Sequence, residues 1–96
     1  MNLKEYYEHY LTLHKDPRCR RMHFVGQLVT IAFAIFVLQG SYWYFLPAIP
    51  FVIYPFAWTG HFLFEKNTPA AFRDPLKAKI SDWLMFRDIL LGRISL

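Results

Sequence analysis

The middle of this 96-residue sequence has no charged side chain. All 18 Asp, Glu, Lys and Arg residues lie in residues 1–23 or 65–96, and residues 24–64 contain none. Charged residues make up about a quarter of an average soluble domain, whereas here they make up 19% and hydrophobic residues 55%. This distribution argues against an ordinary soluble domain, and the hydrophobic content excludes intrinsic disorder.

Other features that secreted proteins and many enzymes depend on are also absent. The single cysteine, Cys19, cannot form an intramolecular disulfide, so a disulfide scaffold is excluded and we interpret this thiol as a spectator. The sequence contains no glycine-rich phosphate loop and no Ser/His/Asp order. We expect no secretory signal, because the first 23 residues are charged and the apolar stretch begins after them.

The position of the cations favours a membrane protein over a nucleic-acid binder. The net charge is +4, and the basic residues flank the apolar block instead of alternating with aromatic residues on a polar face. Cations on either side of apolar spans are typical of membrane proteins whose loops stay cytoplasmic. We therefore predict a lipid membrane as partner and no nucleic acid.

The residue pattern predicts an all-α fold. Asn2 is placed to cap the first helix, and the Asp-Pro pair at residues 16–17 ends it, because the residue before proline avoids the helical region. A second Asp-Pro pair, at residues 74–75, predicts the start of the last helix, and Pro55 predicts a kink within the second apolar segment. The expected elements are an amphipathic helix over residues 2–14, apolar spans over 22–39 and 47–65, and an interfacial helix over 75–94.

The two apolar spans predict a hairpin through the membrane. Each is about 27 Å long as a helix, close to the hydrocarbon thickness of a bilayer. The connector between them is short and uncharged, and the cations lie at the outer ends. The chain is thus expected to be a single integral membrane domain over residues 1–96, multi-pass, with both termini cytoplasmic, and homo-oligomers are compatible with it.

The hairpin brings several metal-binding residue types to its cytoplasmic end. His23 starts the first span, His61 lies near the end of the second, and Glu65 follows His61 by one helical turn. His14, on the apolar face of the first helix, reaches the same level. Imidazole with carboxylate is the ligand set of a non-haem Fe(II) site with open positions and also of a catalytic zinc site. Iron would allow oxygen chemistry on a lipid and zinc would favour hydrolysis, and spacing does not choose between them.

The sequence resembles a known family over nearly its whole length. The residues that carry the resemblance occur in order: Tyr10-x-x-x-His14, Arg21-Met22-His23-Phe24-Val25-Gly26, Trp58-Thr59-Gly60-His61-Phe62-x-x-Glu65-Lys66-Asn67-x-Pro69-Ala70, Asp74-Pro75 and Ser81-Asp82-x-x-Met85. They are similar to the family of small membrane proteins that includes the fungal 2-hydroxy fatty acid dioxygenase. The block that begins at Trp58 is the most specific part.

The resemblance implies a function. It implies a helical membrane enzyme that uses Fe(II) and O2 to shorten a long-chain 2-hydroxy fatty acid by one carbon in α-oxidation. The three histidines would be associated with the iron, and Glu65 and Asn67 match the family motif. A 2-hydroxy acid can chelate a metal through its carboxylate and hydroxyl groups, and Arg20, Arg21 or Lys66 would draw the acid head to the interface.

Three other interpretations remain open from the residues. A non-enzymatic membrane hairpin could scaffold partners, with structural histidines. A zinc-dependent hydrolase could act on lipid esters or amides. A soluble helical oligomer could bury the hairpin between subunits. Metal content separates the two enzymes from the scaffold.

Overall fold

The structure is a computed structural model that describes residues 2–96, and over this range the chain forms helices and no strand. The predicted all-α class is thereby confirmed. The α-helices and the shorter helical turns follow in this order: α1 Leu3–Thr12, α2 Pro17–Gly40, a 3-10 helix Trp43–Phe51, α3 Ile53–Gly60, a π-helical turn His61–Glu65, a 3-10 turn Ala70–Phe72 and α4 Pro75–Leu90.

Two helices, α1 and α4, begin where the local sequence predicts, whereas α2 begins at Pro17, ahead of the span predicted over residues 22–39. The side chains of Asn2, Asp16 and Asp74 each accept a hydrogen bond from a backbone N–H two or three residues later, and so cap α1, α2 and α4. Pro17 and Pro75 follow two of these caps at the start of the helix, where an amide hydrogen would have no helical partner. The caps depend on neighbouring residues alone, which is why the sequence reveals those of α1 and α4. The Asp-Pro pair at residues 16–17, predicted only to end the first helix, also starts the next one.

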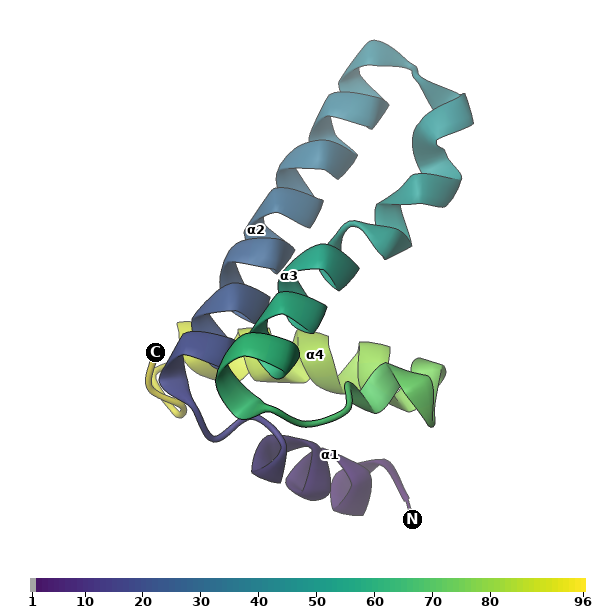
Figure 1. Cartoon of the computed structure of the whole chain (residues 1–96). Helices are drawn as coiled ribbons and strands as arrows, with labels where there is room; N and C mark the ends of the chain where they lie inside the picture. Colours follow the sequence, from purple (N-terminus) through teal and green to yellow (C-terminus); the bar gives the residue numbers. More distant parts are fainter. Residues whose placement is uncertain (1) are drawn as a thin grey trace.

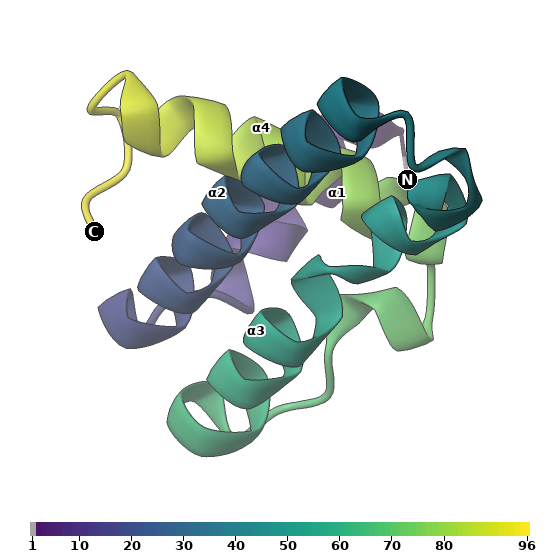
Figure 2. The ribbon, with the colours of Figure 1, turned by 90° about the horizontal axis from the view of Figure 1, so that it is seen from above.

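α2 and the limb that returns from it lie side by side as a hairpin, upright in Figure 1 and viewed along its length in Figure 2. Gly26 permits the close approach of the two limbs. A Cβ atom at this position would lie 2.6 Å from Ile53 Cδ1 and 2.8 Å from Phe56 Cβ, which is closer than side chains can pack. The small residue is therefore needed for the packing of α2 on α3.

The returning limb is helical but not one continuous α-helix. It begins as the 3-10 helix, which contains Pro47 and Pro50, and becomes α-helical only after Val52. Pro55, which the sequence predicts as a kink in mid-helix, lies instead in the first turn of α3, where a missing amide hydrogen breaks no helical bond. The expected kink is thus replaced by a change of helix type.

α1 and α4 lie across the base of the hairpin (Figures 1 and 2). A buried apolar cluster joins them, formed by Tyr10, Ala70, Ala78, Met85 and Ile89. The stacked rings of Phe24 and Phe86, 5.0 Å apart, link α2 to α4. The base is therefore a small core that fixes the lower end of the hairpin.

The outer face of α4 is apolar and exposed. Five large apolar residues of α4 and its C-terminal end are exposed: Leu76, Ile80, Trp83, Leu90 and Leu91. Leu84 and Ile94, expected from their spacing on the same face, are partly buried, and Ile94 packs against the core cluster. The opposite face of α4 packs on the rest of the chain through Ala78, Met85 and Ile89. It ends at Leu90, four residues before the predicted end, and Gly92 follows with a φ of 77° that suits glycine.

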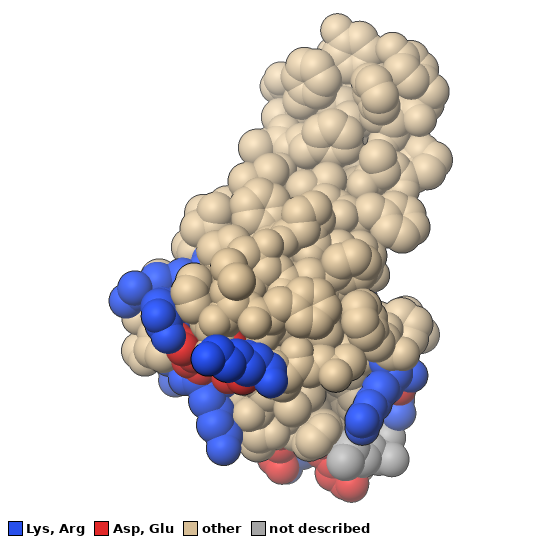
Figure 3. All heavy atoms as spheres, in the orientation of Figure 1, with Lys and Arg blue, Asp and Glu red and all other residues tan. Residues whose placement is uncertain are grey.

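Charge and hydropathy divide the molecule along its length. Among the helices of residues 2–96, one, α2, is long and apolar enough to cross a membrane. Lys, Arg, Asp and Glu side chains gather at the base, whereas the upper hairpin shows none of them (Figure 3). α1, the first helix of the chain, and the C-terminal residues also lie at the base (Figure 1).

A hydrogen bond between α1 and α4 leads to a stability prediction. Tyr7 Oη donates to Asp88 Oδ2 at 2.6 Å, and this bond contributes to the lowered pKa of the Asp88 carboxyl. Because the acceptor is ionised, Tyr7→Phe is expected to lower the free energy of unfolding by about 1.5 kcal/mol at pH 7. Denaturant unfolding in detergent measures this. Tyr44→Phe, at an exposed tyrosine of the hairpin tip, is the control, and an equal loss in both variants would contradict the assignment.

Candidate metal centre

Three of the predicted site histidines meet at the base of the hairpin. His14 lies in the loop after α1, His23 in the second turn of α2 and His61 directly after α3. Each is at most 2% exposed. The ring centroids of His14 lie 4.5 Å from those of both His23 and His61, and all three rings meet edge to face. Separate segments thus place three imidazoles in one buried cluster.

Hydrogen bonds to Nδ1 fix the ring orientation and the tautomer of His14 and His23. His14 Nδ1 lies 2.7 Å from the Tyr10 carbonyl oxygen, and His23 Nδ1 lies 2.9 Å from the Cys19 carbonyl oxygen. A carbonyl oxygen only accepts, so Nδ1 carries the hydrogen in both rings. In a neutral imidazole Nε2 is then an unprotonated acceptor, which is the form that binds a metal.

Asn67 fixes His61 in the same way. Asn67 Nδ2 donates to the Leu13 carbonyl oxygen at 3.1 Å, which turns Oδ1 toward His61 Nδ1 at 2.7 Å. An amide oxygen only accepts, so His61 donates from Nδ1 and keeps the Nε2 lone pair free. A second residue that holds the outer ring nitrogen is the usual support of a metal-binding histidine.

The facing lone pairs suit a bound cation. His14 Nε2 and His23 Nε2 are 3.2 Å apart, and neither ring has a hydrogen to place between them in this tautomer. Burial and the neighbouring imidazoles hold the pKa of His14 well below its usual range, so a shared proton does not bridge them at neutral pH. Two nitrogens bound to one metal at about 2.1 Å would lie roughly 2.9 to 3.4 Å apart. The donor set therefore fits a divalent metal ion.

Two residues outside the predicted set border the histidines. The Tyr10 ring stacks on His14, with the centroids 4.0 Å apart. The Cys19 thiol, interpreted from the sequence as a spectator, is fully buried with the three histidines, and one potential ligand atom from each of the four residues lies within 4.8 Å of the others. Its spacing of four residues from His23 on one helix was the signal in the sequence.

The predicted carboxylate and the cations lie around this cluster. Glu65 Oε1 accepts the backbone N–H of Asp16, and Lys66 is exposed and ends the π-helical turn at a φ of 56°. Arg20 donates to the carbonyl oxygens of His14 (2.9 Å) and Lys15 (2.8 Å). It thereby ties the His14 loop to α2.

Arg21 and the C-terminal residues lie close together. Arg21 is exposed and its guanidinium lies 3.4 Å from the Leu96 carbonyl oxygen, while Arg20 Nε donates to the Ser95 carbonyl oxygen at 2.9 Å. Substrate binding by Arg20, Arg21, Lys66 or Asn67, the four residues that the sequence suggested for it, stays a prediction.

A small cavity of about 30 Å³ lies beside the cluster, room for about one water molecule. His23, His61 and Tyr10 line it, together with the buried carboxyl of Asp82 from α4. Asp82 is not among the site residues predicted from the sequence, although it belongs to the motif Ser81-Asp82-x-x-Met85. Burial raises the pKa of this carboxyl to about 7, against the opposing effects of a hydrogen bond from the Gln27 side chain and the charge of Lys79.

The comparison with protein families agrees with this geometry. The sequence model of the Mpo1-like family, described as 2-hydroxy-palmitic acid dioxygenase Mpo1-like, matches residues 1–94. The chain belongs to the Mpo1-like family. No curated protein and no solved structure matches it. The matched range includes all three histidines, Cys19 and Asn67, so the resemblance seen in the sequence is confirmed at the level of the family.

The role of Asn67 in this Mpo1-like protein can be tested by removing its amide. Asn67→Ala is expected to weaken metal binding about 10- to 100-fold, because His61 loses the acceptor that orients its ring. Metal titration against a competing chelator measures the loss. Thr68→Ala, at the exposed neighbour, should bind metal as the unchanged protein does. Unchanged affinity in the Asn67 variant would show that the ring is held by packing alone.

Proposed function

We propose that this protein is a membrane-bound, Fe(II)-dependent dioxygenase that shortens a long-chain 2-hydroxy fatty acid by one carbon. The observation that carries the proposal is the meeting of three buried imidazoles, each with an Nε2 lone pair lacking a donor, in a chain of the Mpo1-like family. His14, His23 and His61 would hold the ion. When bound, iron supplies a site for dioxygen and for the carboxylate and hydroxyl oxygens of the acid.

The residues around the histidines orient the site and exclude water. Tyr10 covers one face of His14, and the Tyr10 and Cys19 carbonyls and Asn67 fix the ring tautomers. The adjoining cavity of about 30 Å³ suits a molecule as small as dioxygen rather than a fatty acid head group. In this proposal Glu65 supports the metal site by holding the backbone at Asp16.

A larger groove offers a place for the acyl chain. It has a volume of about 190 Å³ and lies between the hairpin and α4, lined by Gln27, Thr30, Ile49, Pro50, Ile53, Lys79 and Trp83. Ile53 and Lys79 also line the small cavity, so the two spaces adjoin. The Lys79 ammonium donates to the Pro50 carbonyl oxygen and lies 5.0 Å from the centre of the Tyr54 ring. We assign to it the attraction of the substrate carboxylate toward the histidines.

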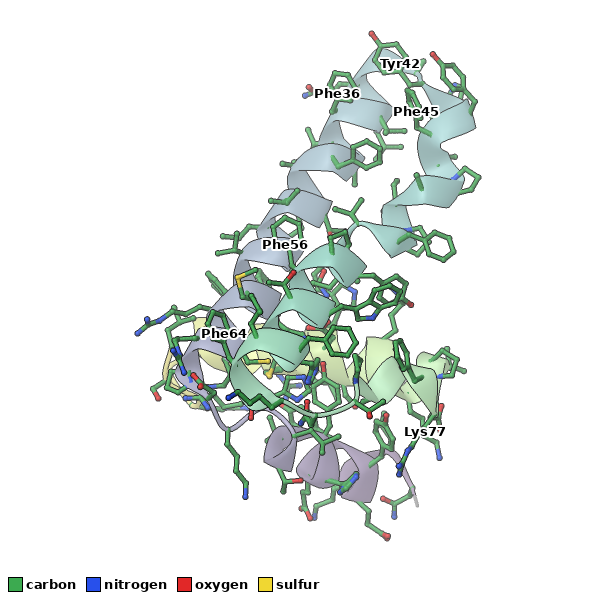
Figure 4. All side chains as sticks on the ribbon, viewed as in Figure 1. Phe36, Tyr42, Phe45, Phe56, Phe64 and Lys77 are labelled. Atoms are coloured by element: carbon green, nitrogen blue, oxygen red, sulfur yellow. The ribbon has the colours of Figure 1, made fainter. Side chains whose placement is uncertain are left out.

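The proposed topology is a two-span hairpin with both termini in the cytoplasm. α2 has 24 residues and so measures about 36 Å, enough for a bilayer, and the returning limb runs beside it without a charge. Phe36, Tyr42 and Phe45 gather at the tip, far from the charged base (Figures 3 and 4). The exposed apolar face of α4 suits a helix that lies on the membrane surface. The metal site would then sit at the cytoplasmic interface.

The test begins with metal content. Protein purified anaerobically in detergent is expected to hold iron near one equivalent, and a His23→Ala/His61→Ala double variant should hold none. The iron-loaded protein should consume O2 with 2-hydroxy palmitic acid and release an acid one carbon shorter, detected by mass spectrometry. Palmitic acid, which differs only in the missing hydroxyl group, is the control substrate and should give no uptake.

Other outcomes would favour the other interpretations. Zinc that is lost in the double variant, with no O2 uptake after Fe(II) loading, would favour a hydrolase. Absence of any specifically bound metal after reconstitution with Fe(II) would leave a membrane hairpin with structural histidines. A monodisperse oligomer that stays in solution without detergent would contradict the membrane topology.

A further inference from the structure

The Cys19 thiol lies beside the three histidines, and its Sγ atom is 3.7 Å from His23 Nδ1. Cys19 is 0% exposed, and its Sγ atom and one ring nitrogen from each of His14, His23 and His61 all lie within 4.8 Å of one another. In each of these three imidazoles Nδ1 carries the hydrogen, so the Nε2 lone pair faces no hydrogen-bond donor. The thiol therefore belongs to a set of donors that already points to a cation.

Two features of the sequence bring the thiol to this place. Cys19 precedes His23 by four residues on α2, so both side chains lie on the same face of the helix. Across the interface, a Cβ atom at Gly60 would lie 3.0 Å from Cys19 Sγ and 3.3 Å from Cys19 Cα. The absence of a side chain at Gly60 lets α3 approach Cys19 this closely, and His61 is the next residue.

We infer that Cys19 is a fourth metal ligand, giving a Cys/His3 site instead of a site of three histidines. The inference rests on the metal site of the proposed function and extends it. Three neutral imidazoles leave both charges of a buried divalent ion uncompensated, and a thiolate cancels one of them, which lowers the cost of burial. A thiol that coordinates a metal loses its proton. No anionic side chain other than this thiolate would be required as a ligand.

The fourth ligand also separates the two enzyme classes. A tetrahedral zinc ion with four protein ligands is closed and has no position for the water that a hydrolase activates. Six-coordinate iron with the same ligands keeps open positions. Cys19 ligation is therefore compatible with the dioxygenase and makes the zinc-loaded form inactive.

Cobalt(II) provides a spectroscopic test that does not depend on turnover. The detergent-purified protein is titrated with Co(II) in a thiol-free buffer. A sulfur-to-cobalt charge-transfer band in the near ultraviolet is expected at one equivalent. Cys19 is the sole cysteine of the sequence, so such a band in the monomeric protein identifies its sulfur as the ligand.

Two variants complete the experiment. Cys19→Ser should lose the band and bind cobalt at least tenfold more weakly. Loss of a residue that only supports a ligand already weakens metal binding about 10- to 100-fold. Glu8→Gln, which removes an exposed anionic side chain on α1 away from the site, should keep the band. Circular dichroism of the metal-free proteins checks that each variant is folded.

The outcomes separate the two proposals. Cobalt bound by the unchanged protein at one equivalent without the band would overturn Cys19 ligation and leave the three-histidine site standing. A band that disappears in Glu8→Gln, or survives in Cys19→Ser, would also overturn it. Failure of the folded, unchanged protein to bind cobalt at all would overturn both the fourth ligand and the metal site of the proposed function.

Discussion

His61→Ala is expected to remove metal binding and turnover together. His61 supplies one of three convergent Nε2 atoms, and its loss leaves two imidazoles, with Nε2 atoms 3.2 Å apart, and the Cys19 thiol, too few ligands to hold the ion through desalting. Bound iron, measured by elemental analysis after desalting, should fall from near one equivalent to background, and O2 uptake with 2-hydroxy palmitic acid should fall with it.

His9→Ala is the matched control for this prediction. His9 lies on the same protein but on the exposed side of α1, so its loss should change neither iron content nor O2 uptake. His61→Gln keeps most of the side-chain volume and should lose metal as the alanine variant does, which separates loss of a ligand from loss of packing. Equal behaviour of the His9 and His61 variants would refute the assignment of the site.

Asp82→Asn is expected to stabilise the protein at alkaline pH. Asp82 is buried on α4, and burial raises the pKa of its carboxyl to about 7 from a usual value near 4. The folded state thus binds this proton more tightly than the unfolded state does. Stability therefore falls as the pH rises from about 4 through 7, where the buried group must ionise. Asparagine has nearly the same shape and does not ionise.

The size of the stability effect of Asp82→Asn follows from the raised pKa of the Asp82 carboxyl. Each pKa unit corresponds to about 1.4 kcal/mol, so the advantage of the variant over the unchanged protein should grow by about 2 to 3 kcal/mol between pH 5 and pH 8. Titration of the buried histidines also changes stability in this range, but it is common to both proteins and cancels in the difference.

Denaturant unfolding in detergent at both pH values measures this difference. Glu8→Gln, which removes an exposed carboxylate from α1, is the control and should show a difference that changes by less than 0.5 kcal/mol with pH, roughly the size usual for surface changes. A stability difference for Asp82→Asn that stays constant from pH 5 to pH 8 would mean that the Asp82 carboxyl is not protonated in the folded protein at neutral pH.

The fold was predictable where it depends on neighbours in the chain. The caps at Asn2 and Asp74 need only residues within one turn, and the structure confirms both. Asp16 was predicted only to end the first helix, and the structure shows that it also caps α2. The returning limb was less predictable. Its composition indicates an apolar helix, but the choice between 3-10, α and π geometry over residues 43–65 depends on how the limb packs against α2, where Gly26 sets the approach.

The candidate site was predictable in part for the same reason. His23 and His61 lie near the ends of segments that must run antiparallel if the chain forms a hairpin, so their proximity follows from topology. The spacing of four residues placed Cys19 on the same helical face as His23, but spacing does not show what that face meets in the folded chain. Asp82 was missed because no periodic pattern distinguishes a carboxyl turned toward the site from one turned toward solvent. Their environment depends on the approach of α3 and α4.

The sequence by itself determined the helical class, the uncharged hairpin, the position of the cations at its outer ends and the family, because composition and short-range spacing are written along the chain. Only the tertiary structure decided which ring nitrogens face one another, that Asn67 holds His61, and that Cys19 is buried among the histidines. Those arrangements need atoms from four segments to be placed within a few ångströms, and packing, rather than periodicity, sets distances of that size.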